Sequence, residues 1–318
     1  MRSCINLSDM LINDCSCLQD PRIEYPSRAS IQRYVNLMSD YGFKQVFGQV
    51  ANKEILIAFL NEIISDRKIV DIEHLRNEQQ SQGADGKKSI YDIYCKTDDG
   101  SRIIVEMQNA YQKDFVDRAI YYSMFPIQEQ IERGSENYQF APIYMVSIIN
   151  FRLSELNSEP EVLSVHKLRS DSTGDILSNK YTFIFIDLLK FKKTLAEIEK
   201  DNILDRFYYC LLNIHKLYER PLVLQQEIFS KLFEAAEIAA MDTPEYQNYI
   251  DAMKTERDIN SIKWSAKEEG REEGRIEGHA EGLVEGKEEV ARSMKLKGLD
   301  NSLIAECTGM SIEQIEKL

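Results

Sequence analysis

The spacing of apolar residues changes several times along this chain, and each spacing predicts a different kind of element. Residues 89–95 and 103–108 are short, rich in Ile, Val and Tyr, and alternate in polarity, which predicts two β-strands. Residues 97–101 between them are rich in turn-forming Asp and Gly, so the two strands are expected to form a hairpin. The near-continuous apolar runs 142–151 and 181–189 predict strands that are buried on both faces of a sheet.

Helical spacing of apolar residues surrounds these strands. It predicts helices within four segments: 39–47, 52–63, 114–130 and 195–249. Asn52 is the expected N-cap of the second helix, and Pro221 is expected to start a new helix within the last segment. Residues 78–88 have the composition of a loop, and residues 159–179 that of a peripheral excursion with one short strand. Strands interleaved with helices predict an α/β core.

Glycine recurs at every fourth position of the tail, usually beside Glu, at Gly270, Gly274, Gly278, Gly282 and Gly286. This spacing falls near one face of an α-helix and would allow close helix–helix approach, so the tail is interpreted as a self-associating or docking helix. The alternative is a frayed linker, because each Gly costs about 1 kcal/mol of helix propensity relative to Ala.

The end of the chain has the pattern of a small helix-turn-helix. Gly298 and Gly309 are the expected turns, and Ser311 is the expected cap of the last helix. Its final segment is short and acidic, which favours a role in packing over DNA reading. The expected organisation has five parts: a poorly ordered leader (1–30), the α/β core (31–190), a helical annex (191–260), the Glu-Gly repeat helix or linker (261–290) and the helix-turn-helix-like tail (291–318).

Composition narrows the class of protein. The 318 residues are 43% hydrophobic and 29% charged, as in ordinary globular proteins. The sequence shows no secretory signal pattern and no apolar run long enough to span a bilayer, so a cytoplasmic protein without membrane contact is expected. The six cysteines form no CxxC pair, and the four histidines lie far apart, which argues against a structural zinc site. The net charge of −14 argues against coating nucleic acid by bulk electrostatics, so any contact with nucleic acid requires a local basic patch or a metal.

The predicted hairpin brings two acids together. If it folds symmetrically about its turn, Ile93 faces Val105 on an apolar side. On the other side Asp92 faces Glu106, and Gln108 follows two residues further along. Carboxylates in such a pair lie roughly 5 Å apart at Cβ and repel each other, and a divalent cation between them would explain the arrangement.

A second interpretation of the hairpin needs no metal. A half-exposed hairpin carries polar residues on its solvated face, where Lys96 and Arg102 could soften the repulsion between the two acids. The hairpin by itself favours this solvated-face interpretation.

Several short motifs follow one another along most of the chain. They are Asp40-Tyr41-Gly42-Phe43-Lys44, Phe47-Gly48, Asn52-Lys53-Glu54, Phe59-Leu60-Asn61, Tyr91-Asp92-Ile93, Val105-Glu106-Met107-Gln108, Phe115, Arg118, Tyr121-Tyr122 and Ile149-Asn150-Phe151. Together they resemble the Rpn family of recombination-promoting nucleases, a group within the PD-(D/E)XK nuclease superfamily that is also labelled transposase. The tail's Glu-Gly repeats and its closing Leu-Lys-x-Gly and Ile-Ala-x-x-Thr-Gly pattern are also typical of that family. The resemblance reverses the preference for a solvated face.

The resemblance implies a restriction-endonuclease-like core, in which helices flank a mixed sheet and which cuts DNA with Mg²⁺. The hard carboxylate oxygens of the two acids would also suit Mn²⁺. Asp92 matches the family's metal-binding Asp and Glu106 its second acid, while Gln108 stands where the superfamily more often has Lys. Asp40 matches an acid that the family has early in the chain, before the Phe-Lys pair, and Glu54 is a second candidate for the role of that acid. Gln can orient a water and donate a hydrogen bond, but it cannot supply the positive charge of Lys.

Three basic residues, Lys44, Lys53 and Arg118, are candidates for contacts with DNA phosphates. Ordinary surface charge or an internal ion pair explains them as well. The leading hypothesis is a metal-dependent DNA endonuclease linked to recombination or mobile DNA. The alternative is a catalytically weak or inactive nuclease fold that acts as a DNA-binding or assembly module, with homo-oligomers formed through the tail. Nothing in the sequence supports strand joining by a true transposase beyond the family's label.

Overall fold

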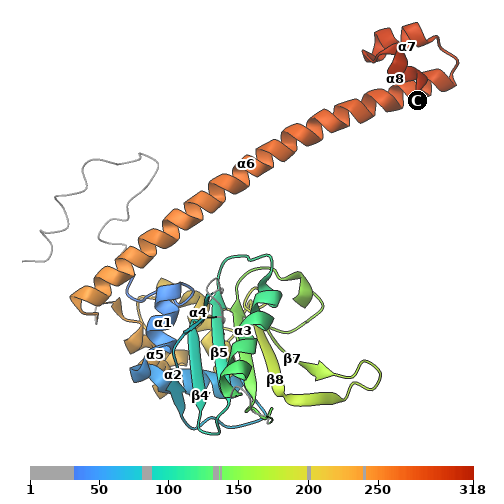
Figure 1. Ribbon diagram of the computed structural model, residues 1–318. Helices are drawn as coiled ribbons and strands as arrows, with labels where there is room; N and C mark the ends of the chain where they lie inside the picture. The colour runs from blue at the N-terminus through green and yellow to red at the C-terminus, as the bar shows by residue number, and fades with distance from the viewer. Residues whose placement is uncertain (1–31, 81–87, 132–135, 137, 199–201, 239–240) are drawn as a thin grey trace, which may run out of the picture. The chain divides into compact units, whose positions relative to one another are not determined.

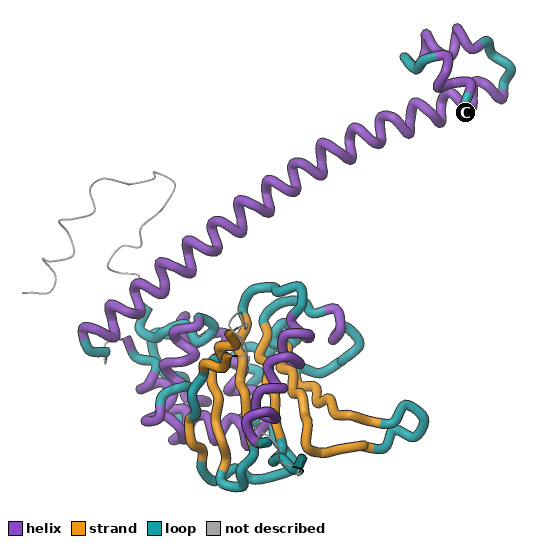
Figure 2. The backbone as a smooth tube through the Cα atoms, viewed as in Figure 1, coloured by secondary structure: helices purple, strands orange, loops and turns teal. Residues whose placement is uncertain are grey.

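The computed structural model divides the chain into two compact units, Met1–Tyr249 and Ile250–Leu318, which we describe separately (Figures 1 and 2). The expected leader at 1–30 lies outside the residues that the structure describes. Those residues are 32–80, 88–131, 136, 138–198, 202–238 and 241–318.

The first unit is built on a six-stranded mixed sheet with the strand order β1-β4-β5-β6-β8-β7. Its strands are β1 (Ile72–His74), β4 (Ile93–Thr97), β5 (Arg102–Gln108), β6 (Ile143–Ile149), β7 (Leu163–Arg169) and β8 (Ile176–Asp187). The three central strands β5, β6 and β8 are parallel, while the outer pairs are antiparallel. The carboxyl ends of β5, β6 and β8 therefore meet at one edge of the sheet.

Among the described residues, the helices that flank this sheet are α1 (Asp40–Phe47), α2 (Lys53–Ile63), α3 (Phe115–Gln130), α4 (Ile203–Asn213) and α5 (Glu227–Ala235), as the family resemblance implied. The chain continues into α6 (Thr243–Leu296), α7 (Asn301–Thr308) and α8 (Ile312–Glu316), which belong mainly to the second unit. Single 3-10 turns are η2 (Val50–Asn52), η3 (Ser154–Leu156), η4 (Ile214–Lys216) and η5 (Leu222–Leu224). Helix α3 covers one face of the central strands, and Figure 1 shows α1, α2, α4 and α5 gathered together on the other side.

The central hairpin has the predicted register, with Ile93 opposite Val105 and a positive φ of 83° at Gly100 in the turn. Its second face, however, is not solvated. Tyr94 and Ile104 on that face are fully buried, together with Ala119 of α3. The interpretation of a half-exposed hairpin was wrong because α3 covers the face that carries the acids.

Helices α1 and α2 begin where the sequence predicted, but the cap expected for α2 is absent, whereas α1 has a cap that was not predicted. The Oγ of Ser39 accepts a hydrogen bond from the amide of Gly42 in α1 at 3.1 Å. A side chain at Gly42 would lie 2.1 Å from the carbonyl oxygen of Asn36, so this close approach requires glycine. Asn52 does not cap α2, because its side chain donates to the carbonyl of Gln45 instead.

Aromatic rings connect the helices on the α1–α2 side of the sheet. Phe47 and Phe59 join α1 to α2, and Phe59 packs against Phe207 of α4, which packs against Phe229 of α5. The ring centroids in this series are 5.0–5.8 Å apart, and all four side chains are buried. Such aromatic contacts contribute stability beyond area burial alone, so this series fixes α1 against the rest of the core.

Three segments differ from their predictions. The ends of the expected loop 78–88 form a separate antiparallel pair, β2 (Glu78–Gln80) with β3 (Lys88–Ile90). Strand β8 starts at Ile176, because it extends to pair with β7. Pro221 precedes the turn η5, and α5 starts only at Glu227. In the first two cases a partner strand decides the conformation, which local composition does not reveal.

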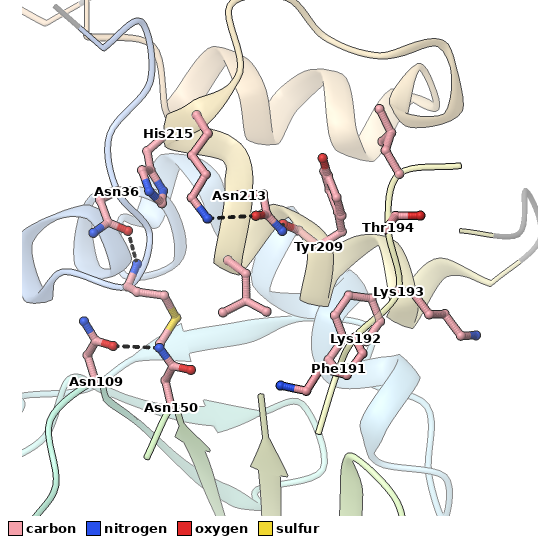
Figure 3. Close-up of a pocket in the computed structure, with 14 residues that line it drawn as sticks. Asn36, Asn109, Asn150, Phe191, Lys192, Lys193, Thr194, Tyr209, Asn213 and His215 are labelled. Atoms are coloured by element: carbon pink, nitrogen blue, oxygen red, sulfur yellow. Dashed lines mark hydrogen bonds between the residues drawn. The ribbon is translucent and has the colours of Figure 1, made fainter. Parts of the chain in front are cut away.

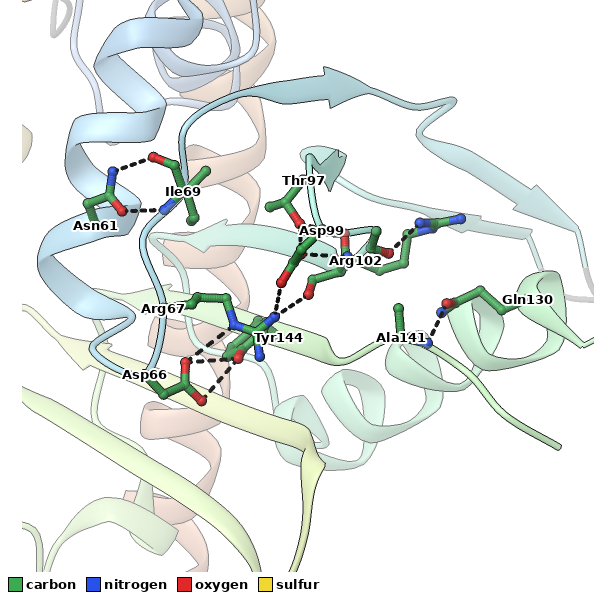
Figure 4. Close-up of polar contacts among 12 residues, drawn as sticks. Asn61, Asp66, Arg67, Ile69, Thr97, Asp99, Arg102, Gln130, Ala141 and Tyr144 are labelled. Carbon is green, nitrogen blue, oxygen red and sulfur yellow. Dashed lines mark hydrogen bonds and ion pairs between the residues drawn. The ribbon is translucent and has the colours of Figure 1, made fainter.

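At the opposite edge of the sheet, the β4–β5 turn is tied to the segment after α2 (Figure 4). Asp99 Oδ1 accepts from Thr97 Oγ1 at 2.6 Å and from the Ser101 amide at 3.0 Å, while its Oδ2 is 2.5 Å from Arg67 Nη1. Although burial acts in the other direction, these hydrogen bonds and the charge of Arg67 lower the pKa of Asp99 to about 2. This network fixes the turn of the hairpin, at the opposite end of the strands from Asp92 and Glu106.

The second unit consists of most of α6 with α7 and α8. The segment 261–290, for which a helix and a linker were both considered, is helical throughout, and α6 is continuous across residue 260. After it, Gly298 and Gly309 have positive φ and Ser311 forms a capping box, as predicted. Ala291, Ile304 and Ile315 form a small buried cluster between these helices. Within the described residues, every helix is too short or too polar to cross a bilayer.

Candidate active site

The structure brings Asp92, Glu106 and Gln108 to the same end of the hairpin. Asp92 directly precedes β4, and Glu106 and Gln108 are the third-last and last residues of β5. The amide of Met107 donates to Asp92 Oδ2 at 2.8 Å, which fixes this carboxylate against β5. The register of the strands thus places Asp92 beside Glu106, at the edge where the parallel strands end.

Both acids are removed from solvent. Glu106 is only 6% exposed, and the side chain of Asp92 is 13% exposed. Burial and the charge of Asp92 raise the pKa of Glu106 to about 8, although Arg118 acts to lower it. Burial also raises the pKa of Asp92, against the lowering effects of the Met107 amide and Lys44. Glu106 Oε1 is buried and accepts no hydrogen bond from any residue that the structure describes.

Lys44 of α1 lies beside Asp92. Its Nζ lies 3.2 Å from Asp92 Oδ1 and 2.5 Å from Oδ1 of Asp40, one turn earlier on α1. Burial acts to lower the pKa of Lys44, but the hydrogen bond to Asp40 and the charge of Asp92 outweigh it and raise that pKa. The lysine therefore stays charged beside the two acids.

Arg118 of α3 lies on the side of Glu106 and Gln108. Its Nη2 donates to Gln108 Oε1 at 3.2 Å and lies 3.9 Å from Glu106 Oε2. The guanidinium lies 5.3 Å from the ring of Phe115 and 5.5 Å from that of Tyr122. These contacts hold the arginine and orient the amide of Gln108.

Two other candidates lie elsewhere in the structure. Glu54 is exposed and pairs with Lys231 of α5, and Lys53 pairs with Asp71 at 2.7 Å. Asp40 is thus the first-helix acid that shares a lysine with Asp92, and Glu54 does not join this cluster.

The charges that offset the two acids are also not the expected ones. Lys96 and Arg102 lie opposite each other in the hairpin register, near the turn and at the other end of the strands from Asp92. Arg102 instead donates to the carbonyl of Gly100 and lies 3.9 Å from Glu129. Lys44 and Arg118, two candidates for phosphate contacts, lie beside the acids. The helical spacing of Phe115, Arg118 and Tyr122 is the sequence signal that places the arginine on the face of α3 that covers the hairpin.

The donor set suits a hard divalent cation. Mg²⁺ is typically bound in proteins by one or two carboxylates, with water and substrate phosphate as the other ligands. The buried Glu106, whose Oε1 has no hydrogen-bond partner among the described residues, and the largely buried Asp92 fit this chemistry. In the described part of the chain, no group of three or more His, Cys, Asp and Glu side chains is arranged for a metal, so the structure offers no complete cage such as structural zinc requires.

A comparison with models of protein families gives a match over most of the chain. The family model described as "PD-(D/E)XK nuclease family transposase" matches residues 37–266. The match includes α1, the hairpin with its two acids, and α3. Searches of curated proteins and of solved structures found no match.

Proposed function

The chain belongs to the PD-(D/E)XK nuclease family transposase group, and from this premise we propose that it is a metal-dependent DNA endonuclease linked to recombination or mobile DNA. The observation that carries the proposal is the buried Glu106 with the largely buried Asp92 beside it, at the carboxyl edge of the sheet. Two carboxylates this well buried destabilise the fold unless a proton or a cation compensates them. Binding of a cation would explain why the two carboxylates lie side by side away from solvent.

Asp92 and Glu106 are the residues that would hold Mg²⁺ or Mn²⁺, with Asp40 next to them across Lys44. When bound, such a cation neutralises charge on the scissile phosphate and makes a water more acidic. Glu106 gives up its proton for this state, because ligands to a hard cation must be deprotonated. Arg118 stays close enough to stabilise the ionised form of Glu106.

Lys44 supplies the positive charge that Gln108 lacks. Gln108 stands at the position where related nucleases more often have Lys, and its amide can only orient a water and donate a hydrogen bond. The Nζ of Lys44 lies 3.2 Å from Asp92, so the charge comes from α1 instead of β5. We assign charge stabilisation at the phosphate to Lys44, and orientation of the attacking water to Gln108.

A second function has its own supporting observation, on α6. Its apolar residues Ile262, Ile276, Leu283 and Val290 recur at multiples of seven residues, and each is 48–69% exposed. This spacing matches one of the two apolar positions in each heptad of a coiled coil, with Glu269 at the one interruption, so we propose that α6 pairs copies of the chain. Two copies would allow two strands of DNA to be cut. If the site does not cut, the same seam supports an assembly module.

The test is cleavage of supercoiled plasmid in Mg²⁺, Mn²⁺ or Ca²⁺ by the wild type and by Asp92→Ala. The matched control is Glu54→Ala, which removes an exposed acid of α2 that lies outside the cluster. We expect nicking that requires Mg²⁺ or Mn²⁺, disappears in Asp92→Ala and persists in Glu54→Ala. Equal nicking by the wild type and Asp92→Ala would mean a contaminant or a different site. The absence of cleavage together with the absence of Mg²⁺ binding in calorimetry would favour the assembly module.

A further inference from the structure

A pocket of about 620 Å³ lies at the carboxyl edge of the parallel strands, next to the candidate active site (Figure 3). Asn109 directly follows β5, and Asn150 directly follows β6. The backbone amide of Asn150 donates to the carbonyl of Gln108 at 3.1 Å, so the pocket and the active site share this part of the sheet edge. Crevices outside the carboxyl ends of parallel strands are the usual ligand sites of α/β folds.

The pocket differs in charge from the rest of the chain. Its 14 lining residues include three lysines and one histidine but no Asp or Glu, in a protein of net charge −14. Lys193 is compensated by Asp205, whose Oδ2 lies 2.5 Å away. Lys216 donates to Asn213 Oδ1 at 3.0 Å, and neither it nor Lys192 forms an ion pair with any described residue. Two uncompensated lysines in an acid-free pocket indicate an anionic ligand.

The pocket also carries groups that suit a nucleobase. Asn150 Nδ2 donates to Asn109 Oδ1 at 2.9 Å, which leaves the amide hydrogens of Asn109 and the carbonyl oxygen of Asn150 for a ligand. Tyr209 is half-buried in the wall formed by α4 (Figure 3). His215 Nδ1 is buried and has no hydrogen-bond partner among the described residues, and burial together with Lys216 lowers the pKa of this histidine. A neutral imidazole at this position can donate or accept a hydrogen bond.

On the basis of the nuclease function proposed above, we propose that this pocket binds one or two unstacked nucleotides of a DNA strand next to the cleaved bond, so that the substrate is single-stranded or locally unpaired DNA. Lys192 and Lys216 contact the phosphates, and Tyr209 stacks on a base. The combination of a basic groove and an aromatic ring is the usual way to bind single-stranded DNA. A volume of about 620 Å³ suits a nucleotide-sized ligand, and it cannot contain a base-paired duplex.

The test measures binding separately from cleavage. Fluorescence anisotropy with a labelled 12-nucleotide DNA, single-stranded or annealed to its complement, is recorded in EDTA over a range of salt concentrations. The full-length chain is used as wild type, as the double variant Lys192→Ala/Lys216→Ala, and as the control Lys68→Ala/Lys180→Ala. The control removes two exposed lysines from the opposite end of the sheet, where Lys68 follows Arg67 and Lys180 lies in the first half of β8.

We expect the wild type and the control to bind the single strand more tightly than the duplex. The Lys192/Lys216 double variant should bind it about tenfold more weakly. The slope of log affinity against log salt should be smaller in magnitude by about 1.4, because each phosphate contact on a single strand contributes about 0.7. Tyr209→Leu should also bind the single strand about tenfold more weakly, while Tyr209→Phe, which keeps the ring, should bind it like the wild type. Circular dichroism verifies that each variant is folded.

Two results would overturn the pocket assignment. One is a double variant that binds with wild-type affinity and salt slope, even if the wild type cuts DNA. The other is tighter binding of an RNA strand of the same sequence, which would assign the pocket to RNA. The catalytic proposal fails independently, if the wild type does not cut while its single-strand binding still depends on Lys192 and Lys216.

Discussion

The buried carboxyl of Glu106 makes one prediction that does not depend on DNA. Its pKa is about 8 in the folded chain against an ordinary value of 4.5, so between these pH values the folded state holds a proton that the unfolded state has released. The contribution of Glu106 to the free energy of unfolding is therefore highest below pH 4.5, and this contribution is lost as the pH rises towards 8. At about 1.4 kcal/mol per pH unit, the loss by pH 7 is about 3 kcal/mol.

Glu106→Gln tests this reasoning, because glutamine has nearly the same shape and remains neutral. Urea unfolding in EDTA at pH 5, 7 and 8 should show a small difference in the free energy of unfolding at pH 5. The difference should grow to about 3 kcal/mol in favour of the variant at pH 7. Glu54→Gln, at an exposed acid, should show no such gain. Adding Mg²⁺ at pH 8 should stabilise the wild type and leave Glu106→Gln unchanged, since the variant has lost a ligand.

Two results would refute the argument about Glu106. One is a stability difference that stays constant between pH 5 and 8, which would mean that the carboxyl does not titrate with a raised pKa. The other is a variant that is less stable than the wild type at pH 8, which would mean that the ionised carboxylate is well compensated in the apo protein.

Four further predictions follow from described contacts. Lys44→Gln should lower single-turnover nicking by about 100-fold, while Lys44→Arg, which keeps the charge, should lose less than tenfold. The Mg²⁺ affinity measured by calorimetry should rise by up to about tenfold per pH unit between pH 6 and 8, because binding releases the proton of Glu106. Asp99→Asn should lower the melting temperature slightly at pH 7 and not at pH 2, because the ionised Asp99 stabilises the fold only above its lowered pKa of about 2. The effect should be small because the Asp99 side chain is half-exposed. Phe59→Ala should cost about 3–5 kcal/mol in urea unfolding, since the ring is fully buried between two other aromatic rings.

The sequence predicted those parts of the fold that short-range patterns determine. The hairpin register followed from the turn, because a strand that slips by one residue exchanges its two faces. The buried face of α2 followed from the helical spacing of its apolar residues. These are Ile55, Leu56, Phe59, Leu60 and Ile63, and all five are buried. The pairing of β2 with β3 could not be predicted, because it depends on the partner strand and not on the composition of 78–88.

The site was predictable only in part, for a similar reason. Alternation along the strands placed Asp92 and Glu106 together, but it could not reveal that α3 covers them. The choice between Asp40 and Glu54 depends on how α1 packs against the hairpin, and neither residue's local sequence contains that information. The pocket was missed altogether, since its lining comes from five separate segments of the chain. The one available signal was the position of Asn109 and Asn150, directly after parallel strands.

The acid-free pocket in an acidic protein has a consequence for the rate of encounter with DNA. A chain of net charge −14 and a polyanion repel each other at long range, and this repulsion is screened once the Debye length falls to about 10 Å near 0.1 M salt. The lysines of the pocket act only at short range, after contact. Added salt should therefore speed association while shortening the lifetime of the complex. Stopped-flow mixing would show an association rate constant that rises with ionic strength, opposite to the usual behaviour of basic DNA-binding proteins.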